Sequence, residues 1–169
     1  MEGEMKQRTL SLLVDNTAGV MSRVAGLFSR RAFNIDSLSV GVTMDPRYSR
    51  ITIVASGDDQ ALDQIIKQVR KREEVRNVKV LEPGNSVQRE LMLVKVRATE
   101  EERDRVISLA RIFHSKIVDV SRHSITCEVK GPMTKLDAFL ELLEDYEVLE
   151  LARTGVTGLS RGSGDVTFL

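Results

Sequence analysis

The feature of this sequence that most constrains its fold is one order of local patterns that occurs twice. In the first half, a run of alternating apolar residues is followed by apolar residues at helical spacing. Two runs rich in β-branched residues, a second helical stripe and a final β-like run come next. The expected strands are 8–14, 35–42, 49–55 and 75–81, and the expected helices carry the stripes Val20, Val24, Leu27, Phe28 and Leu62, Ile65, Ile66, Val69.

The second half repeats this order after a segment of strong structure breakers. Glu82-Pro83-Gly84-Asn85-Ser86 ends the first series. Thr99 and Glu102 then have the spacing of a capping box, which predicts the start of a helix. The expected strands are 90–97, 117–120, 125–129 and 148–152, and the expected helices carry the stripes Val106, Leu109, Ala110, Phe113 and Leu136, Phe139, Leu140, Leu143.

Each half has the strand and helix order of the split βαβ, or ferredoxin-like, unit. The expected fold class is therefore α+β, with two tandem ferredoxin-like βαββαβ domains. We place the first domain at 1–82, a linker at 83–87, and the second domain, which ends in a glycine-rich tail, at 88–169. Two helices cover only one face of such a sheet, and the other face would be partly apolar. This predicts self-association.

Charge, cysteine and aromatic content narrow the classes of partner. The 25 Lys and Arg residues balance 25 Asp and Glu, so no net charge attracts nucleic acid or an anionic membrane. The aromatic content is 4%, which argues against an RNA-binding sheet because such sheets stack bases on exposed aromatic rings. With a single Cys127, no apolar leader at the N-terminus and no apolar run of about 20 residues, a cytoplasmic protein is expected.

The segment Asp15-Asn16-Thr17-Ala18-Gly19-Val20-Met21 carries the strongest chemical signal, because it joins the first expected strand to the first expected helix. A helix N-terminus presents free N–H groups and the positive end of the helix dipole to an anion. Gly19 would let a ligand come close to the backbone. The carboxylate of a free amino acid fits this turn, and a plain capped turn is the alternative interpretation.

An amino-acid ligand would also need oxygen acceptors for its ammonium and an apolar wall for its side chain. The candidate acceptors are Asp15, Asn16 and Asn34. The candidate wall residues are Val20, Met21 and Ile35.

The sequence offers no arrangement typical of a metal site or an active site. His114 and His123 are nine residues apart and do not have metal-ligand spacing. Cys127 alternates with apolar residues and is expected to be a buried thiol. No phosphate-binding loop, dinucleotide fingerprint or set of nucleophile, acid and base is present. We therefore expect no catalytic residue, no metal and no cofactor in this chain.

Several stretches in the same order resemble the regulatory (small) subunit of acetolactate synthase, also called acetohydroxyacid synthase. The resemblance covers about Arg8 to Gly162. The stretches that carry it are Asp15-Asn16-Thr17-Ala18-Gly19-Val20-Met21-Ser22-Arg23-Val24, Arg31-Ala32-Phe33-Asn34-Ile35-Asp36-Ser37-Leu38, Ser49-Arg50-Ile51-Thr52-Ile53, Lys116-Ile117-Val118-Asp119-Val120 and Arg153-Thr154-Gly155-Val156-Thr157-Gly158-Leu159-Ser160-Arg161-Gly162.

The resemblance implies that the first domain is an ACT domain and that two ACT domains pair as a homodimer with effector sites at their interface. The effector would be valine or another branched-chain amino acid, acting by feedback inhibition. The implied partner is the catalytic large subunit, which uses thiamine diphosphate, magnesium and FAD. The implied effector-binding residues are Asn16, Gly19, Val20 and Met21 from one protomer and Asn34 and Ile35 from the other.

Two positions depart from the family pattern. Ala32 stands where glycine is common, and Met21 stands where leucine is usual. Alanine costs roughly 1 kcal/mol if that backbone is left-handed, whereas leucine to methionine nearly conserves volume. The resemblance also implies that the tail docks on another surface. A stand-alone ACT-type amino-acid sensor that controls a different partner remains the alternative function.

Overall fold

The structure is a computed structural model that describes residues 5–29 and 33–164. The chain divides into two compact units. The first unit runs to Val87 and also contains the chain from Val156 onward, and the second comprises Gln88–Gly155. Each unit is an antiparallel sheet with two helices, which confirms the two ferredoxin-like domains.

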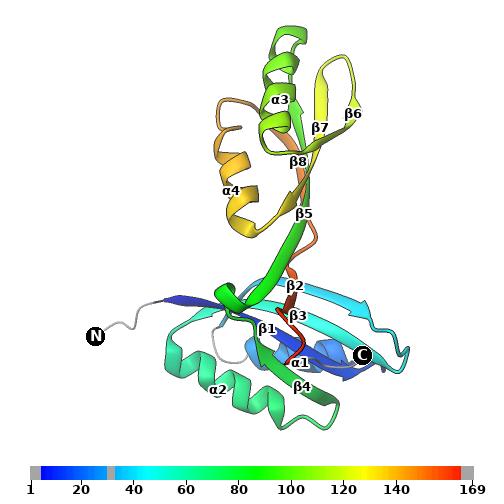
Figure 1. Ribbon diagram of the computed structural model, residues 1–169, viewed down its shortest axis with the longest axis vertical. Coiled ribbons are helices and arrows are strands. Elements are labelled where there is room, and N and C mark those ends of the chain that lie inside the picture. The colour runs from blue at the N-terminus through cyan, green and yellow to red at the C-terminus, as the bar shows by residue number, and fades with distance from the viewer. Residues whose placement is uncertain (1–4, 30–32, 165–169) are drawn as a thin grey trace. The chain divides into compact units, whose positions relative to one another are not determined.

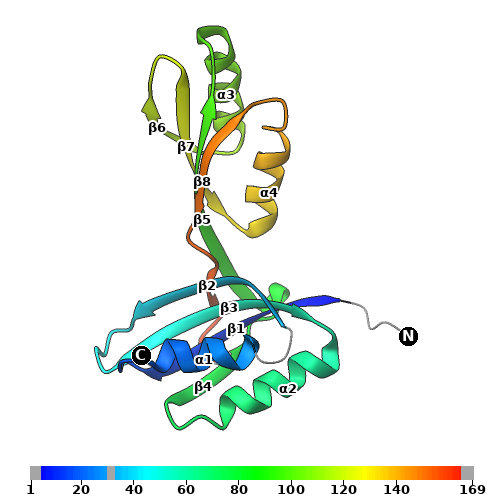
Figure 2. The same ribbon diagram turned by 180° about the vertical axis from the view of Figure 1, so that it is seen from behind.

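The first unit has the predicted order of strands and helices. Its sheet order is β2-β3-β1-β4, and all three strand pairs are antiparallel. Helices α1 and α2 lie on the same face of this sheet (Figure 2). The elements are β1 Lys6–Asp15, α1 Val20–Ser29, β2 Asn34–Val42, β3 Tyr48–Gly57, α2 Asp59–Arg70 and β4 Val75–Val80.

The core of the first unit lies between this sheet and its helices. Asp58 caps α2, because its Oδ1 accepts a hydrogen bond of 2.7 Å from the Ala61 N–H. The four predicted residues of the α2 stripe are all buried, as expected of an amphipathic helix packed on a sheet. The fully or nearly fully buried members of the core are Leu10, Leu12, Val14, Val20, Val24, Phe28, Ile51, Ile53, Ala55, Leu62, Ile65, Ile66, Val69 and Val78.

The helix-free face of the first sheet is covered by the C-terminal segment of the chain itself. Val156 donates its N–H to Ser37 Oγ at 2.8 Å and accepts from Ser39 Oγ at 2.7 Å. These serines pair with Val54 and Thr52 across β2 and β3, so all four side chains share one face. Val54 is 0% exposed and Val156 is 2% exposed. The expectation that this face is bare was wrong, because a segment more than 100 residues away in sequence returns to it.

The segment expected to be a linker is an ordered part of the first unit. Pro83–Asn85 forms one 3-10 turn (η1), and strand β5 (Ser86–Arg97) begins immediately after it. Ser86 is 4% exposed, and its Oγ donates to the Glu82 carbonyl at 2.7 Å. Strand β9 (Thr157–Ser160) pairs with β5. The tail therefore belongs with the first unit and not with the second, contrary to the domain boundaries expected from the sequence.

The second unit repeats the same topology with sheet order β6-β7-β5-β8. Figure 1 shows α3 and α4 on one side of these strands. The predicted capping box opens α3, since Thr99 Oγ1 accepts from the Glu102 N–H and Glu102 Oε2 accepts from the Thr99 N–H. Its further elements are α3 Glu100–Ile112, β6 Lys116–Val120, β7 Ser124–Gly131, α4 Met133–Glu141 and β8 Val148–Arg153.

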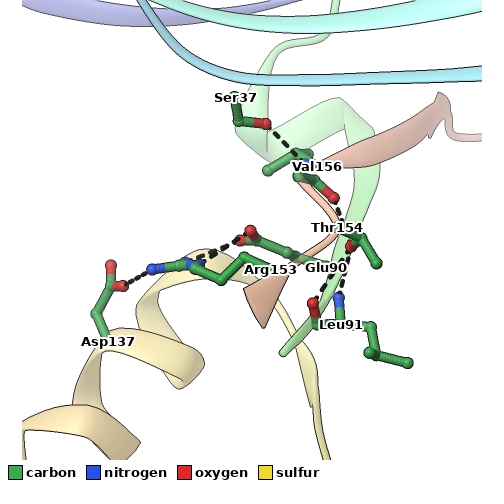
Figure 3. Close-up of polar contacts among 8 residues, drawn as sticks. Ser37, Glu90, Leu91, Asp137, Arg153, Thr154 and Val156 are labelled. Carbon is green, nitrogen blue, oxygen red and sulfur yellow. Dashed lines mark hydrogen bonds and ion pairs between the residues drawn. The ribbon is translucent and has the colours of Figure 1, made fainter. Parts of the chain in front are cut away.

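An ion-pair network fixes the end of β8 to the rest of the second unit (Figure 3). Arg153 binds both oxygens of Glu90, at 3.0 and 2.8 Å, and also Asp137 of α4 at 2.9 Å. The Glu90 side chain is 4% exposed, and a carboxylate this buried is costly without an ion-pair partner, which Arg153 supplies. Thr154 follows and donates its N–H to the Leu91 carbonyl at 3.0 Å. The chain is thus fixed within the second unit up to Thr154.

The helix-free face of the second sheet is polar. Cross-strand pairing places Lys95 opposite Glu150 on this face, with their charged groups 3.0 Å apart. Leu93 is the exposed large apolar residue on the same face of β5, at 40% exposure. Charged side chains therefore lie on this second face, where the sequence led us to expect a partly apolar surface.

Helix α3 ends in a Schellman motif that uses a residue other than glycine. His114 has a φ of 51°, the Ser115 N–H donates to Ala110 O at 2.7 Å, and the His114 N–H donates to Arg111 O at 3.1 Å. Because a left-handed backbone disfavours a Cβ atom, His114→Gly should stabilise the second unit by up to about 1 kcal/mol. The urea midpoint of the Val94 and Val129 amide signals measures this.

The control for that prediction is Arg111→Gly, which places glycine inside the same helix. It should destabilise the second unit by about 1 kcal/mol, because glycine there loses backbone entropy without relieving strain. A lower urea midpoint for His114→Gly would contradict the strain argument.

Cys127 lies in the second core as predicted, at 0% exposure. Burial raises the pKa of its thiol to about 11, so roughly one thiol in a thousand is ionised at pH 8, and the thiolate is the reactive form. We expect iodoacetamide to label Cys127 slowly in the folded chain and quickly in guanidinium chloride. Equal labelling rates in the two conditions would contradict the buried position.

Candidate functional site

The predicted binding turn lies between β1 and α1, and it is held by the loop before β3. The Asn16 N–H donates to the Arg47 carbonyl at 2.7 Å, and the Asn16 Nδ2 donates to the Pro46 carbonyl at 2.9 Å. Gly19 has a φ of 82°, a conformation that glycine adopts readily. The sequence therefore folds here into a tight turn with exposed residues from Asn16 to Gly19.

The start of α1 offers N–H groups to a ligand. The first helical hydrogen bond that spans the turn runs from the Arg23 N–H to Gly19 O at 3.0 Å. For the N–H groups of Met21 and Ser22, the described residues supply no backbone acceptor, as is usual in a first helical turn. The first turn of α1 contains no acidic residue. Its positive dipole end is therefore free to stabilise an anion.

Two ion pairs surround the turn and engage its charged side chains. Arg76 binds both carboxylate oxygens of Asp15 at 2.7 Å, and these hydrogen bonds lower the pKa of Asp15. Arg23 Nε lies 2.7 Å from Glu74 Oε1. Because Asp15 already has a bidentate cationic partner, it is the weakest of the three candidate acceptors for a ligand ammonium.

The two asparagines keep their carbonyl oxygens available. Asn16 and Asn34 each use Nδ2 as a donor, Asn16 to Pro46 O and Asn34 to Asp36 Oδ1. No donor to either Oδ1 is present among the residues that the structure describes. An amide oxygen is a suitable acceptor for an ammonium group, so each side chain keeps one group that a ligand ammonium would need.

Sequence reasoning missed the part that Asp36 plays at the start of β2. The register of β2 against β3 shifts between Ile35 and Ser37, which leaves Asp36 as a bulge residue. Its carboxylate accepts from Gln7 Nε2 at 3.0 Å and also from Ser56 and Asn34. These bonds orient the Asn34 side chain. They depend on strand pairing, which no local pattern reveals.

Within one protomer, the turn and Asn34 lie at opposite ends of the sheet. Asp15 pairs with Tyr48, and Val42 at the end of β2 pairs with Ser49. Asn34 pairs with Ser56, toward the other end of β3. Eight residues of strand at about 3.3 Å each separate the two ends by roughly 25 Å. The structure thus brings Asn16, Gly19, Val20 and Met21 together and leaves Asn34 and Ile35 apart from them.

Comparison with known proteins identifies the family. Residues 10–77 match the family described as the AHAS small subunit-like ACT domain, and residues 89–162 match the family described as the small subunit of acetolactate synthase. The acetolactate synthase small subunit of Mycolicibacterium smegmatis is 48% identical over 154 residues, which cover 91% of each chain. The acetolactate synthase isozyme 3 small subunit of Escherichia coli is 46% identical over 157 residues, covering 92% of this chain and 96% of the relative.

The chain belongs to the acetolactate synthase small-subunit family. A solved structure agrees with this assignment. The acetolactate synthase small subunit from Thermotoga maritima superposes with a TM-score of 0.84 at 42% identity, covering 94% of this chain and 99% of that one. The first unit is an ACT domain, the chain is a regulatory small subunit, and its family implies a catalytic large-subunit partner.

Against this family background, the three predicted wall residues have different environments. Val20 is 3% exposed and belongs to the first core, and Ile35 is half-buried and packs against it. Met21 is 48% exposed. Of the three side chains, Met21 is therefore best placed to contact a ligand, whereas Val20 and Ile35 mainly hold the backbone of the turn and of β2 in position.

The other singled-out residues lie away from the turn or outside the described chain. Ala32, the main departure from the small-subunit pattern, lies outside the described residues. His114 and His123 are exposed in the second unit. Across residues 5–29 and 33–164, no three His, Cys, Asp or Glu side chains are grouped as metal ligands. No helix in this part of the chain is long and apolar enough to span a bilayer.

Proposed function

We propose that this small subunit raises the activity of the acetolactate synthase large subunit, and that valine or another branched-chain amino acid reverses this effect by binding at the β1–α1 turn. One observation supports the site most directly. A left-handed Gly19 precedes a helix start with unpaired N–H groups in a domain of the small-subunit ACT family. That combination suits the carboxylate of an amino acid.

The proposed homodimer follows from the position of β2. β2 is an edge strand of the first sheet, and an unpaired edge accepts another strand readily. If two β2 strands pair antiparallel about a two-fold axis, Asn34 of the partner subunit lies opposite the Val42 end of β2. That is also the end of the sheet at which the β1–α1 turn lies. Pairing of this kind would join the two separated groups of site residues.

The chemistry of the proposed complex uses the groups that are free in the single chain. The ligand carboxylate would accept from the Met21 and Ser22 N–H groups, and its ammonium would donate to Asn16 Oδ1 and to Asn34 Oδ1 of the partner subunit. The exposed Met21 side chain would contact the branched aliphatic group. Val20 and Ile35 would support this arrangement from the core.

Catalysis would remain with the large subunit. Thiamine diphosphate, magnesium and FAD would be bound there and would supply the condensation of pyruvate with a second 2-keto acid. The regulatory effect needs only a coupling free energy of about 1 to 3 kcal/mol between the effector site and the large-subunit interface. Contacts that differ modestly between two states of the dimer can supply a coupling free energy of this size.

The test is reconstitution. Purified chain is added to purified large subunit, and acetolactate formation is measured with and without valine, leucine and isoleucine. We expect the rate to rise on addition of the chain and to fall again with valine. A chain that binds valine yet neither binds nor activates the large subunit would instead be a stand-alone amino-acid sensor, and the proposal would be wrong.

A further inference from the structure

A hollow of about 320 Å³ lies near the Val42 end of β2 on the helix-free face of the first sheet, opposite the face that α1 covers. It is within the size range of sites for small molecules. The strand pairs Ser39 with Thr52 and Gly41 with Arg50 form its floor. Thr157, from the C-terminal segment that returns to this face, contributes to its wall.

Arg50 brings an uncompensated positive charge to this hollow. Its Nη1 donates to Ser11 Oγ at 2.9 Å. In the described part of the chain, no carboxylate lies within 4.0 Å of its guanidinium. Partial burial lowers the pKa of Arg50, and a guanidinium still remains fully charged at neutral pH. The other donors of the planar group are left for a ligand, and their geometry matches a carboxylate.

Two hydroxyl groups beside the guanidinium are also free. Ser39 Oγ and Thr43 Oγ1 already donate, to Val156 O and Asp45 O. The hydroxyls of Thr52 and Thr157 line the hollow and have no hydrogen-bond partner among the described residues. One cation and two free hydroxyl donors therefore line one partly open hollow, which is the donor set of an anion site.

Gly41 keeps the hollow open. A Cβ atom added at Gly41 would meet no heavy atom within 4 Å, and Gly41 pairs directly with Arg50. The open space above this glycine and the Arg50 side chain both line the same hollow. A single cation balances a single negative charge, and a dianion would keep an uncompensated charge in a partly desolvated site.

We propose that this hollow is a second ligand site that binds a small monocarboxylate, with the carboxylate on Arg50 and hydrogen bonds from Thr52 and Thr157. Because Thr157 belongs to the C-terminal segment, an occupied site would link this segment to β2 and β3. The proposed site uses residues of the helix-free face, whereas the amino-acid site proposed at the β1–α1 turn lies at Gly19 and Met21, at the start of α1.

The proposed second site is tested by titrating the full chain with sodium butyrate at constant ionic strength. The readout is the shift of the backbone amide signals of Ser39, Thr43 and Thr157. Butyramide has nearly the same shape without the charge, and we expect it to bind at least about tenfold more weakly. Inorganic phosphate is the probe for a different anion class. It should bind more weakly than butyrate, and tighter phosphate binding would overturn the carboxylate assignment.

Two variants act on the hollow in independent ways. Arg50→Gln removes the charge, and Gly41→Val fills the space while favouring the strand conformation. Each should weaken butyrate binding at least about tenfold, whereas Arg105→Gln, an exposed arginine of α3, should leave it unchanged. If Arg50→Gln does not fold, Gly41→Val decides alone. Butyrate shifts confined to residues 16–22, or binding by a folded variant equal to the parent's, would refute the second site.

Discussion

Replacing Gly19 with Asp is expected to abolish the valine response of the reconstituted enzyme and to leave activation of the large subunit intact. The aspartate carboxylate would lie at the helix start and compete with the ligand carboxylate for the same N–H groups. Each charge-assisted hydrogen bond that the ligand loses is worth about 1.5 to 3 kcal/mol. The dissociation constant for valine should therefore rise about a hundredfold or more.

Folding should survive this substitution. The left-handed backbone of Gly19 costs a side chain roughly 1 kcal/mol, and an acidic residue at a helix start recovers about 0.3 to 1 kcal/mol. A Cβ at Gly19 would lie 2.9 Å from Arg23 Nη1, which is the end of a flexible side chain that can move. The net change in stability is small compared with the change in binding.

Calorimetric titration with valine measures the effect, and Gly19→Ala is the matched control. Alanine has the same backbone strain and adds no carboxylate, so it should weaken valine binding much less than aspartate. An affinity of Gly19→Asp equal to that of the parent would place the effector site elsewhere in the chain.

The substitution Val156→Asp should destabilise the first unit by roughly 3 kcal/mol or more. Val156 is 2% exposed on the helix-free face, between its hydrogen bonds to Ser37 and Ser39. A carboxylate buried there would lose its hydration, which is costly. The C-terminal segment should then leave this face and expose Val54.

Amide hydrogen exchange reports this loss within each unit separately. Exchange at Leu13 and Val54 of the first unit should become much faster, and exchange at Val94 of the second unit should not change. The control is Leu159→Asp in strand β9, which follows Val156 directly, because the Leu159 side chain is 60% exposed. Equal effects of the two substitutions would show that Val156 does not hold the segment in place.

The fold was predictable from the sequence because its signals are local. Helix stripes, the Asp58 cap and the Thr99–Glu102 capping box depend on residues within a few positions of one another. The family pattern is likewise spread over nearly the whole chain. By contrast, the return of Val156 to β2 joins residues 117 and 119 positions apart. The glycines on both sides of Val156 are also typical of a frayed chain end, so no local pattern predicts this contact.

The candidate site was predictable only in part for the same reason. The turn with Gly19 is a local feature, so its backbone geometry could be anticipated. The partial burial of Ile35, the engagement of Asp15 by Arg76 and the bulge at Asp36 all depend on strand pairing. The anion-binding hollow around Arg50 also needs Thr157, which comes from the far end of the chain.

The central claim, an effector site shared between two protomers, is tested most directly by mixing two inactive variants. Gly19→Asp damages the turn, and Asn34→Ala removes the acceptor expected from the partner subunit, so each variant alone should bind valine weakly. After unfolding and refolding together, random pairing should restore about one intact site for every four chains, because half of the dimers combine a sound turn with a sound Asn34. Calorimetry of the mixture should show that fraction binding with the parent affinity. No recovery of valine binding in the mixture would contradict a site shared between protomers.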